Sequence, residues 1–213
     1  MAKGIDREKI QSVTLDLLKN QENIRNVNLR EIARQLGCAH TNLYNYYNDL
    51  DQIFWEALDV ILERMETFLT ADLSDLPDGN TKIYRFYTRF IEFYLENPGW
   101  FRLVWLEKLE APRPQKNINL TNQTVAVFCE LLADYFKEEY SIELSHAEAK
   151  YILHGVHCYL HGEVSIFISG RGLIKDTDAF KQHVVETCVH LSALLATALK
   201  NGEVETLHPA FSD

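Results

Sequence analysis

Six side chains between residues 40 and 46 can form hydrogen bonds with base edges or with phosphate oxygens, and none of them is acidic. They are His40, Thr41, Asn42, Tyr44, Asn45 and Tyr46. Leu43 lies among them at the position of an inward-facing residue on a short helix. A polar surface of this kind, held by one buried leucine, is typical of an element that reads DNA in the major groove.

The residues before this segment predict the element that would position it. Apolar residues at helical spacing begin after Asn28, and Asn28 and Glu31 have the spacing of a capping box. Gly37 ends the expected helix, because glycine adopts the positive φ of a tight turn without strain. The sequence therefore predicts a helix-turn-helix over about residues 28–47.

A net charge of −10 is by itself unfavourable for DNA binding, but the charge is unevenly distributed. Residues 1–50 hold seven Lys and Arg against six Asp and Glu, so the excess of acid lies in residues 51–213. Tyrosine hydroxyls and helix N-terminal amides can hold phosphates without adding charge. We therefore expect residues 1–50 to bind DNA with an affinity that depends only weakly on salt concentration.

Three histidines form a second candidate group. His154, His157 and His161 lie at i, i+3 and i+7, and Cys158 lies between them. The last two histidines could chelate a transition metal, but zinc needs three or four converging ligands and none is evident. We therefore predict no metal and no cofactor, and expect these side chains to contact an effector or to pack. The four cysteines form no CxxC pair and predict no disulfide framework.

The 213 residues have few glycines and prolines and recurrent apolar spacing near 3.6, which predicts an all-α fold. The apolar stretches are too short to span a membrane, and no apolar region follows Met1, so we expect a cytoplasmic protein. About nine helices are expected: five at about residues 7–21, 28–36, 39–46, 50–69 and 82–96, a shorter one after Asn97-Pro98-Gly99, and three at about residues 122–137, 145–170 and 176–200.

The run from Asn28 to Ala33, the turn Leu36-Gly37-Cys38 and the run from Asn42 to Tyr47 resemble the DNA-binding region of the TetR family of bacterial transcriptional regulators. The resemblance covers about residues 7–66. It implies that Arg30 reaches a base or a phosphate, that Tyr44 and Tyr46 grip phosphates, and that Tyr47 is a core aromatic. The DNA-binding residues expected are Asn28, Arg30, Ala39, His40, Thr41, Asn42, Tyr44, Asn45 and Tyr46.

Two positions depart from the family pattern. Leu50 stands where a lysine commonly contacts the DNA backbone, and Cys38-Ala39-His40 stands where Val-Ser-Lys is commoner. The loss of two cations affects the expected affinity rather than the expected fold.

Residues 51–213 are expected to bind an effector and to dimerise. The segments 90–103 and 160–165 are similar to a subset of TetR-like regulators with a Trp-His-Gly type motif, although Leu160 replaces the tryptophan. The expected effector-binding residues are Phe86, Tyr87, Phe90, Tyr94, Trp100, Phe101, Trp105, Phe128, His154, His157, Cys158 and His161. The expected dimer interface contains Val164, Phe167, Ile168, Val184, Leu191 and Leu195.

Together these features predict a homodimeric repressor, not an enzyme, that leaves a palindromic operator on double-stranded DNA when a small-molecule effector binds. Residues 1–50 would be the DNA-binding head, and the helix over residues 50–69 would transmit the effector's influence. Two alternatives stay open: a helical partner-binding module without DNA binding, and a metal- or ligand-binding enzyme that uses the histidines at 154, 157 and 161.

Overall fold

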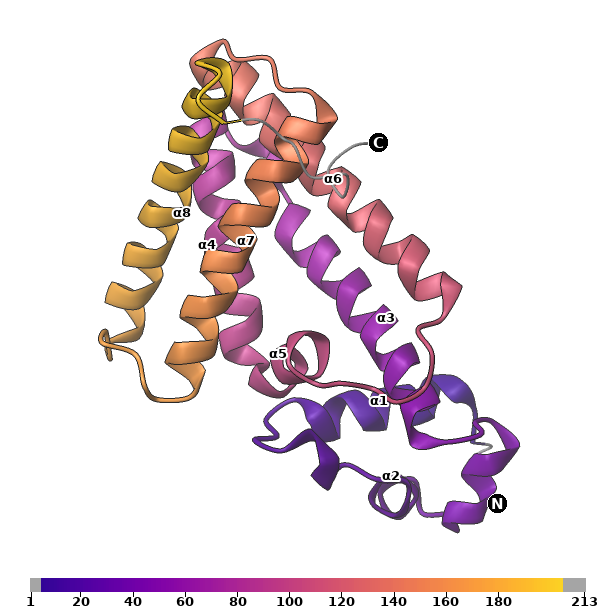
Figure 1. The fold of residues 1–213 in the computed structure, drawn as a ribbon. Helices are drawn as coiled ribbons and strands as arrows, with labels where there is room; N and C mark the ends of the chain where they lie inside the picture. The colour runs from indigo at the N-terminus through magenta and orange to yellow at the C-terminus, as the bar shows by residue number, and fades with distance from the viewer. Residues whose placement is uncertain (1–4, 205–213) are drawn as a thin grey trace. The chain divides into compact units, whose positions relative to one another are not determined.

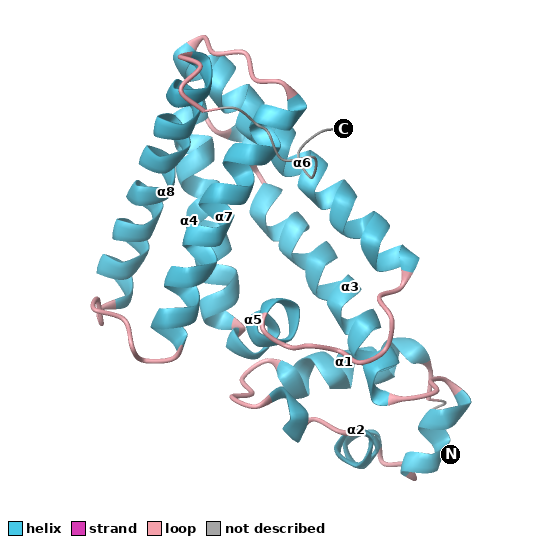
Figure 2. Cartoon of the chain, viewed as in Figure 1, coloured by secondary structure: helices cyan, strands magenta, loops and turns pink. Residues whose placement is uncertain are grey.

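The computed structural model describes residues 5–204, and this range contains eight α-helices, three short 3-10 helices and no strand (Figure 1, Figure 2). The α-helices are α1 Arg7–Leu18, α2 Leu29–Leu36, α3 Leu50–Thr70, α4 Gly79–Glu96, α5 Pro98–Trp105, α6 Gln115–Tyr140, α7 His146–Ile168 and α8 Thr177–Lys200. The 3-10 helices are η1 Ile24–Asn26, η2 His40–Asn45 and η3 Leu73–Asp75. The predicted all-α class is confirmed, with η2 in the place of the third expected helix.

Several predicted helix ends were wrong by a few residues. The largest difference is at α6, which begins at Gln115 instead of residue 122. The first residues of α6 are mostly polar and show little apolar periodicity, so the pattern gave no sign of them. Their helix is supported by tertiary contacts instead: Asn117 is buried, and its amide donates a 2.7 Å hydrogen bond to Asp59 on α3.

The described chain divides into two compact units. The first unit contains residues 5–65 and 96–121, and the second unit contains residues 66–95 and 122–204. Helix α3 continues without a break from Leu50 to Thr70, so no helix end marks the functional division that we expect at residue 50. That division remains a prediction.

In the first unit, α5 is fixed to the end of α1. The backbone N–H of Gly99 donates to the carbonyl of Lys19 at 2.9 Å, and the indole N–H of Trp100 donates to the carbonyl of Leu15 at 2.9 Å. A Cβ atom on Gly99 would lie 1.7 Å from the carbonyl oxygen of Leu18. Only glycine permits this approach of the two backbones.

In the second unit, α7 and α8 lie side by side (Figure 1). The ring of Phe167 on α7 stacks on that of Phe180 on α8, with 4.0 Å between centroids. The hydroxyl of Tyr87 on α4 lies 2.9 Å from that of Ser192 on α8, and both residues are buried. No helix in residues 5–204 is long and apolar enough to cross a membrane.

Candidate nucleic-acid interface

Helix α2 begins with a side-chain cap from Asn28. The Oδ1 atom of Asn28 accepts hydrogen bonds from the backbone N–H groups of Arg30 and Glu31, both at 3.1 Å. This cap satisfies two of the free donors at the start of the helix. The carboxylate of Glu31 accepts hydrogen bonds of 2.5 and 2.9 Å from Arg34, rather than the bond from the backbone N–H of Asn28 that a capping box would have. The contact with Arg34 lowers the pKa of the Glu31 carboxyl. The first role of Asn28 is therefore structural, and its contact with DNA stays a prediction.

The turn after α2 has the predicted geometry. Gly37 adopts φ 67° and ψ 33°, in the left-handed region, and its N–H bonds to the carbonyls of Ala33 and Arg34. The N–H of Cys38 then donates to the carbonyl of Ala33 at 3.0 Å. Glycine at this position lets the chain reverse and start η2.

Segment η2 presents the expected polar surface. Leu43 is fully buried, and it anchors a short helix whose other side chains are exposed. The expected α-helix is a 3-10 helix, because i to i+3 bonds such as that from Tyr46 N–H to the Leu43 carbonyl hold it. The exposed predicted residues are Ala39, His40, Thr41, Asn42, Tyr44 and Asn45.

The tyrosines of this region have different surroundings. Tyr44 is 54% exposed, and its side chain is accessible to a partner. Tyr46 is half-buried and donates a 2.6 Å hydrogen bond to the carbonyl of Ile5. Tyr47 is buried, as predicted for a core aromatic, and its hydroxyl donates to Glu56 at 2.6 Å. Burial and this carboxylate raise the pKa of Tyr47 to about 12. Tyr46 could grip a phosphate only by giving up its bond to Ile5.

The start of α2 and segment η2 form one shallow, open concavity. Its lining residues are Asn28, Leu29, Arg30, His40, Tyr44 and Leu50. Arg30 is exposed, and its side chain makes no hydrogen bond or ion pair with any residue in the described range. Four of the predicted DNA-binding residues thus share one surface with Leu50, the position where the family commonly has a lysine.

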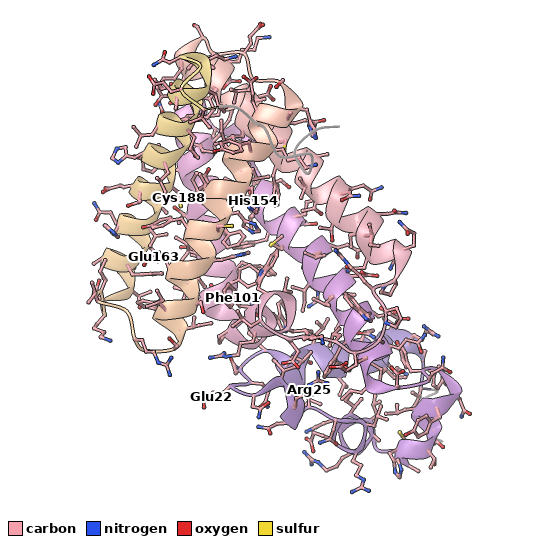
Figure 3. All side chains as sticks on the ribbon, in the orientation of Figure 1. Glu22, Arg25, Phe101, His154, Glu163 and Cys188 are labelled. Atoms are coloured by element: carbon pink, nitrogen blue, oxygen red, sulfur yellow. The ribbon has the colours of Figure 1, made fainter. Side chains whose placement is uncertain are left out.

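Two other arginines of the first unit form ion pairs with carboxylates of the same unit. Arg7 pairs with Glu56 and lies over the ring of Tyr47, 4.6 Å from the centroid. Arg25 (labelled in Figure 3) donates to Glu107 at 2.7 Å and to the carbonyl of Lys108 at 2.8 Å. The sequence could not reveal these pairs, because Arg25 and Glu107 are 82 residues apart. Arg30, unlike Arg7 and Arg25, has its charge available to a phosphate.

The structure divides the predicted effector residues between the two units. Phe86, Tyr87, Phe90, Tyr94 and Phe128 are buried in the second unit, where Phe86 contacts Phe128 with ring centroids 4.9 Å apart. Trp100, Phe101 and Trp105 belong to the first unit. Trp105 is half-buried, whereas the other seven are buried as core residues are, and a role in effector binding stays a prediction.

The histidines meet the aromatic cluster of the second unit. The rings of His157 and His161 are 3.8 Å apart, and each lies 5.6 Å from that of Phe90. Burial lowers the pKa of His157 to about 4 and that of His161 to about 3, so both are neutral near neutral pH. His154 (labelled in Figure 3) and Cys158 are exposed, with Nε2 and Sγ 3.7 Å apart. No group of three or more His, Cys, Asp or Glu within residues 5–204 is placed to hold a metal ion.

The expected dimer residues occupy two environments. Val164 and Val184 are fully buried between elements of their own chain, so they belong to the core of the protomer and offer no surface to a partner. Phe167, Ile168, Leu191 and Leu195 are half-buried. Ile166 and Leu194, on the same two helices, are 46% and 67% exposed. Both helices are apolar on more than one side, so spacing alone could not separate the inner faces from the outer faces.

Comparisons with known proteins agree with these features. The family described as "Tetracyclin repressor-like, C-terminal domain" matches residues 83–188. An uncharacterized HTH-type transcriptional regulator of Haemophilus influenzae is 24% identical over 157 residues, which cover 71% of this chain and 76% of the relative.

Solved structures share the fold at low identity. A Rhodococcus protein of unknown function has a TM-score of 0.73 and 13% identity over 91% of this chain and 97% of its own. A TetR-family transcriptional regulator from Streptomyces coelicolor has a TM-score of 0.70 and 15% identity over 92% of this chain and 84% of its own. From the family match, the relative and the common fold, the chain is a member of the TetR family of transcriptional regulators.

Proposed function

We propose that this regulator acts as a homodimeric repressor that binds a palindromic operator and leaves it when a small-molecule effector binds. The observation that carries the proposal is the surface shared by Arg30, His40 and Tyr44, which is exposed, polar and free of carboxylates. Arg30 supplies one available positive charge, and the tyrosine and histidine supply hydrogen bonds to bases or phosphates. The proposed site of action is the cytoplasm, and no enzymatic step is part of the proposal.

Two exposed apolar residues on α7 and α8 support dimerisation. Ile166 and Leu194 are large apolar residues with much of their surface in water. Gly162 is exposed on α7, with no atom within 4 Å of where a Cβ would stand, and leaves room for a neighbouring helix to approach closely. A twofold dimer would present two reading heads to half-sites about 34 Å apart, which is one turn of DNA.

Release by an effector follows from linkage. An effector that binds better to the conformation with low DNA affinity weakens the binding of DNA. By linkage, bound DNA weakens the binding of the effector by the same factor. Helix α3 contributes residues to both units and is the proposed connection. Equal DNA affinity with and without a bound effector would remove the basis for this part of the proposal.

The direct test is the selection of random duplex DNA by the purified protein, followed by sequencing of the enriched sites. We expect a palindrome whose half-sites are about one turn apart. The variant Arg30→Ala should lose the enrichment, whereas Arg34→Ala should keep it, because Arg34 lies on the same helix but is paired with Glu31. No enrichment by a folded dimer would contradict the repressor and favour the helical partner-binding module.

A further inference from the structure

A cavity of about 280 Å³ lies within the first unit, among α3, α5 and the first turns of α6. Its walls are mainly apolar and include Trp55, Leu58, Leu62, Leu103 and Trp105. The volume is at the lower end of the range for ligand pockets, roughly 300–1,000 Å³. A small molecule with a flat apolar body fits these walls.

The carboxylates near the cavity are already paired. Glu107 lines it, and its Oε1 atom accepts a 2.7 Å bond from Arg25. Asp59 is buried beside it and accepts a 2.7 Å bond from the amide of Asn117, while Lys116 lies 3.2 Å from its other oxygen. Neither acid is left to attract a cationic ligand.

Arg113, in contrast to these carboxylates, has no partner of opposite charge among the residues that the structure describes. Its Nε atom donates to Oδ1 of Asn117 at 2.7 Å and its Nη2 atom donates to the hydroxyl of Thr121 at 2.6 Å. Both acceptors are neutral, and Arg113 forms no ion pair with any residue that the structure describes. The buried amide of Asn117 is itself held by Asp59, so the guanidinium of the exposed Arg113 is oriented at the mouth of the cavity, without a carboxylate partner and with further N–H groups to donate.

From this arrangement we infer that the cavity binds a small organic anion whose carboxylate pairs with Arg113 and whose flat apolar body lies against Trp55 and Trp105. An arginine fork matches the geometry of a carboxylate and can hold it through two parallel hydrogen bonds. The binding of such an anion does not depend on the proposed function. Only its identification as the effector that releases DNA rests on that function.

The cavity wall also connects with the start of the DNA-reading element. Arg25 belongs to η1 and holds the segment after α5 through Glu107 and the carbonyl of Lys108. Asp51, in the first turn of α3, accepts bonds from the N–H groups of Glu110 and Ala111 at 2.6 and 3.0 Å. Since Glu107 also lines the cavity, a ligand in the cavity would lie beside the segment that fixes η1, directly before the Asn28 cap.

The experiment is calorimetry of the full chain with three matched probes: 2-naphthoate, its neutral amide 2-naphthamide, and the 2-naphthylmethylammonium cation. We expect 2-naphthoate to bind once per chain and at least about tenfold more tightly than either other probe. Equal affinity for the acid and the amide, or no heat from 2-naphthoate, would overturn the inference.

Variants locate the probe. Arg113→Gln should weaken binding of 2-naphthoate by about tenfold and leave the amide unchanged, whereas the exposed Arg171→Gln in the second unit should change neither. Val104→Phe, which fills the cavity, should weaken both probes. Undiminished binding of 2-naphthoate by folded Arg113→Gln would also overturn the inference. The calorimetric titrations contain no DNA. Their result therefore does not depend on whether the selection of operator DNA succeeds.

Discussion

Gly99 and Leu18 come so close that a Cβ atom at position 99 would stand 1.7 Å from the carbonyl oxygen of Leu18. The same glycine donates a 2.9 Å backbone hydrogen bond to Lys19. This contact joins the start of α5 to the end of α1, the first helix of the DNA-reading head. The position of α5 within the first unit therefore depends on the absence of one methyl group.

The variant Gly99→Ala should be strongly destabilised. The added methyl would meet backbone atoms that no side-chain rotation can move, so we expect a loss of about 3 kcal/mol or more in the free energy of unfolding. Urea denaturation followed by circular dichroism measures this loss. The control is Gly172→Ala, where a Cβ would make ordinary contacts of 3.5 Å and longer. Similar stability of the two variants would contradict the close approach of α1 and α5.

The variant Leu194→Glu should be monomeric. A carboxylate at the centre of an apolar interface would be buried without a partner, which costs about 3 kcal/mol or more for each subunit. Sedimentation velocity measures the change in mass. Leu106→Glu is the control, since Leu106 is 58% exposed but lies in the first unit. If Leu194→Glu remains a dimer, α7 and α8 do not form the interface.

The buried histidines predict a loss of stability in mild acid. Burial lowers the pKa of His157 to about 4 and that of His161 to about 3, from an ordinary value of 6.5. Between these limits the unfolded chain binds more protons than the folded chain. The free energy of unfolding should therefore fall as the pH drops below 6.5, by up to about 1.4 kcal/mol per pH unit for each histidine.

Chemical denaturation at a series of pH values tests this dependence. His161→Phe keeps a ring against Phe90 and should reduce the slope by up to about 1.4 kcal/mol per pH unit, because one of the two groups no longer titrates. The exposed His183→Phe on α8 is the control. An unchanged slope in His161→Phe would mean that other groups cause the acid sensitivity.

Local signals in the sequence predicted local structure well. Asn28 caps α2, and Gly37 adopts the left-handed turn that ends it. Leu43 is buried as the anchor of η2. Each of these features depends on residues within a few positions of one another, so the sequence contains the whole interaction.

Features that depend on tertiary contacts could not be predicted in this way. The early start of α6 depends on Asp59, which lies 58 residues before Asn117. The burial of Val164 and Val184 depends on how α7 and α8 face each other. The cavity beside Arg113 is formed by segments distant in sequence, and the residues that line it showed no common pattern.

The central claim is that the surface around Arg30 and Tyr44 reads DNA, and the most direct measurement is the affinity of the Tyr44→Ala variant for the selected duplex. Tyr44 is exposed, so its removal should leave the fold intact. Fluorescence anisotropy should show at least about a tenfold loss of affinity, with an unchanged unfolding transition. The control Tyr84→Ala, whose ring is 39% exposed on α4, should bind as the parent chain does. Parental affinity in Tyr44→Ala would contradict the account.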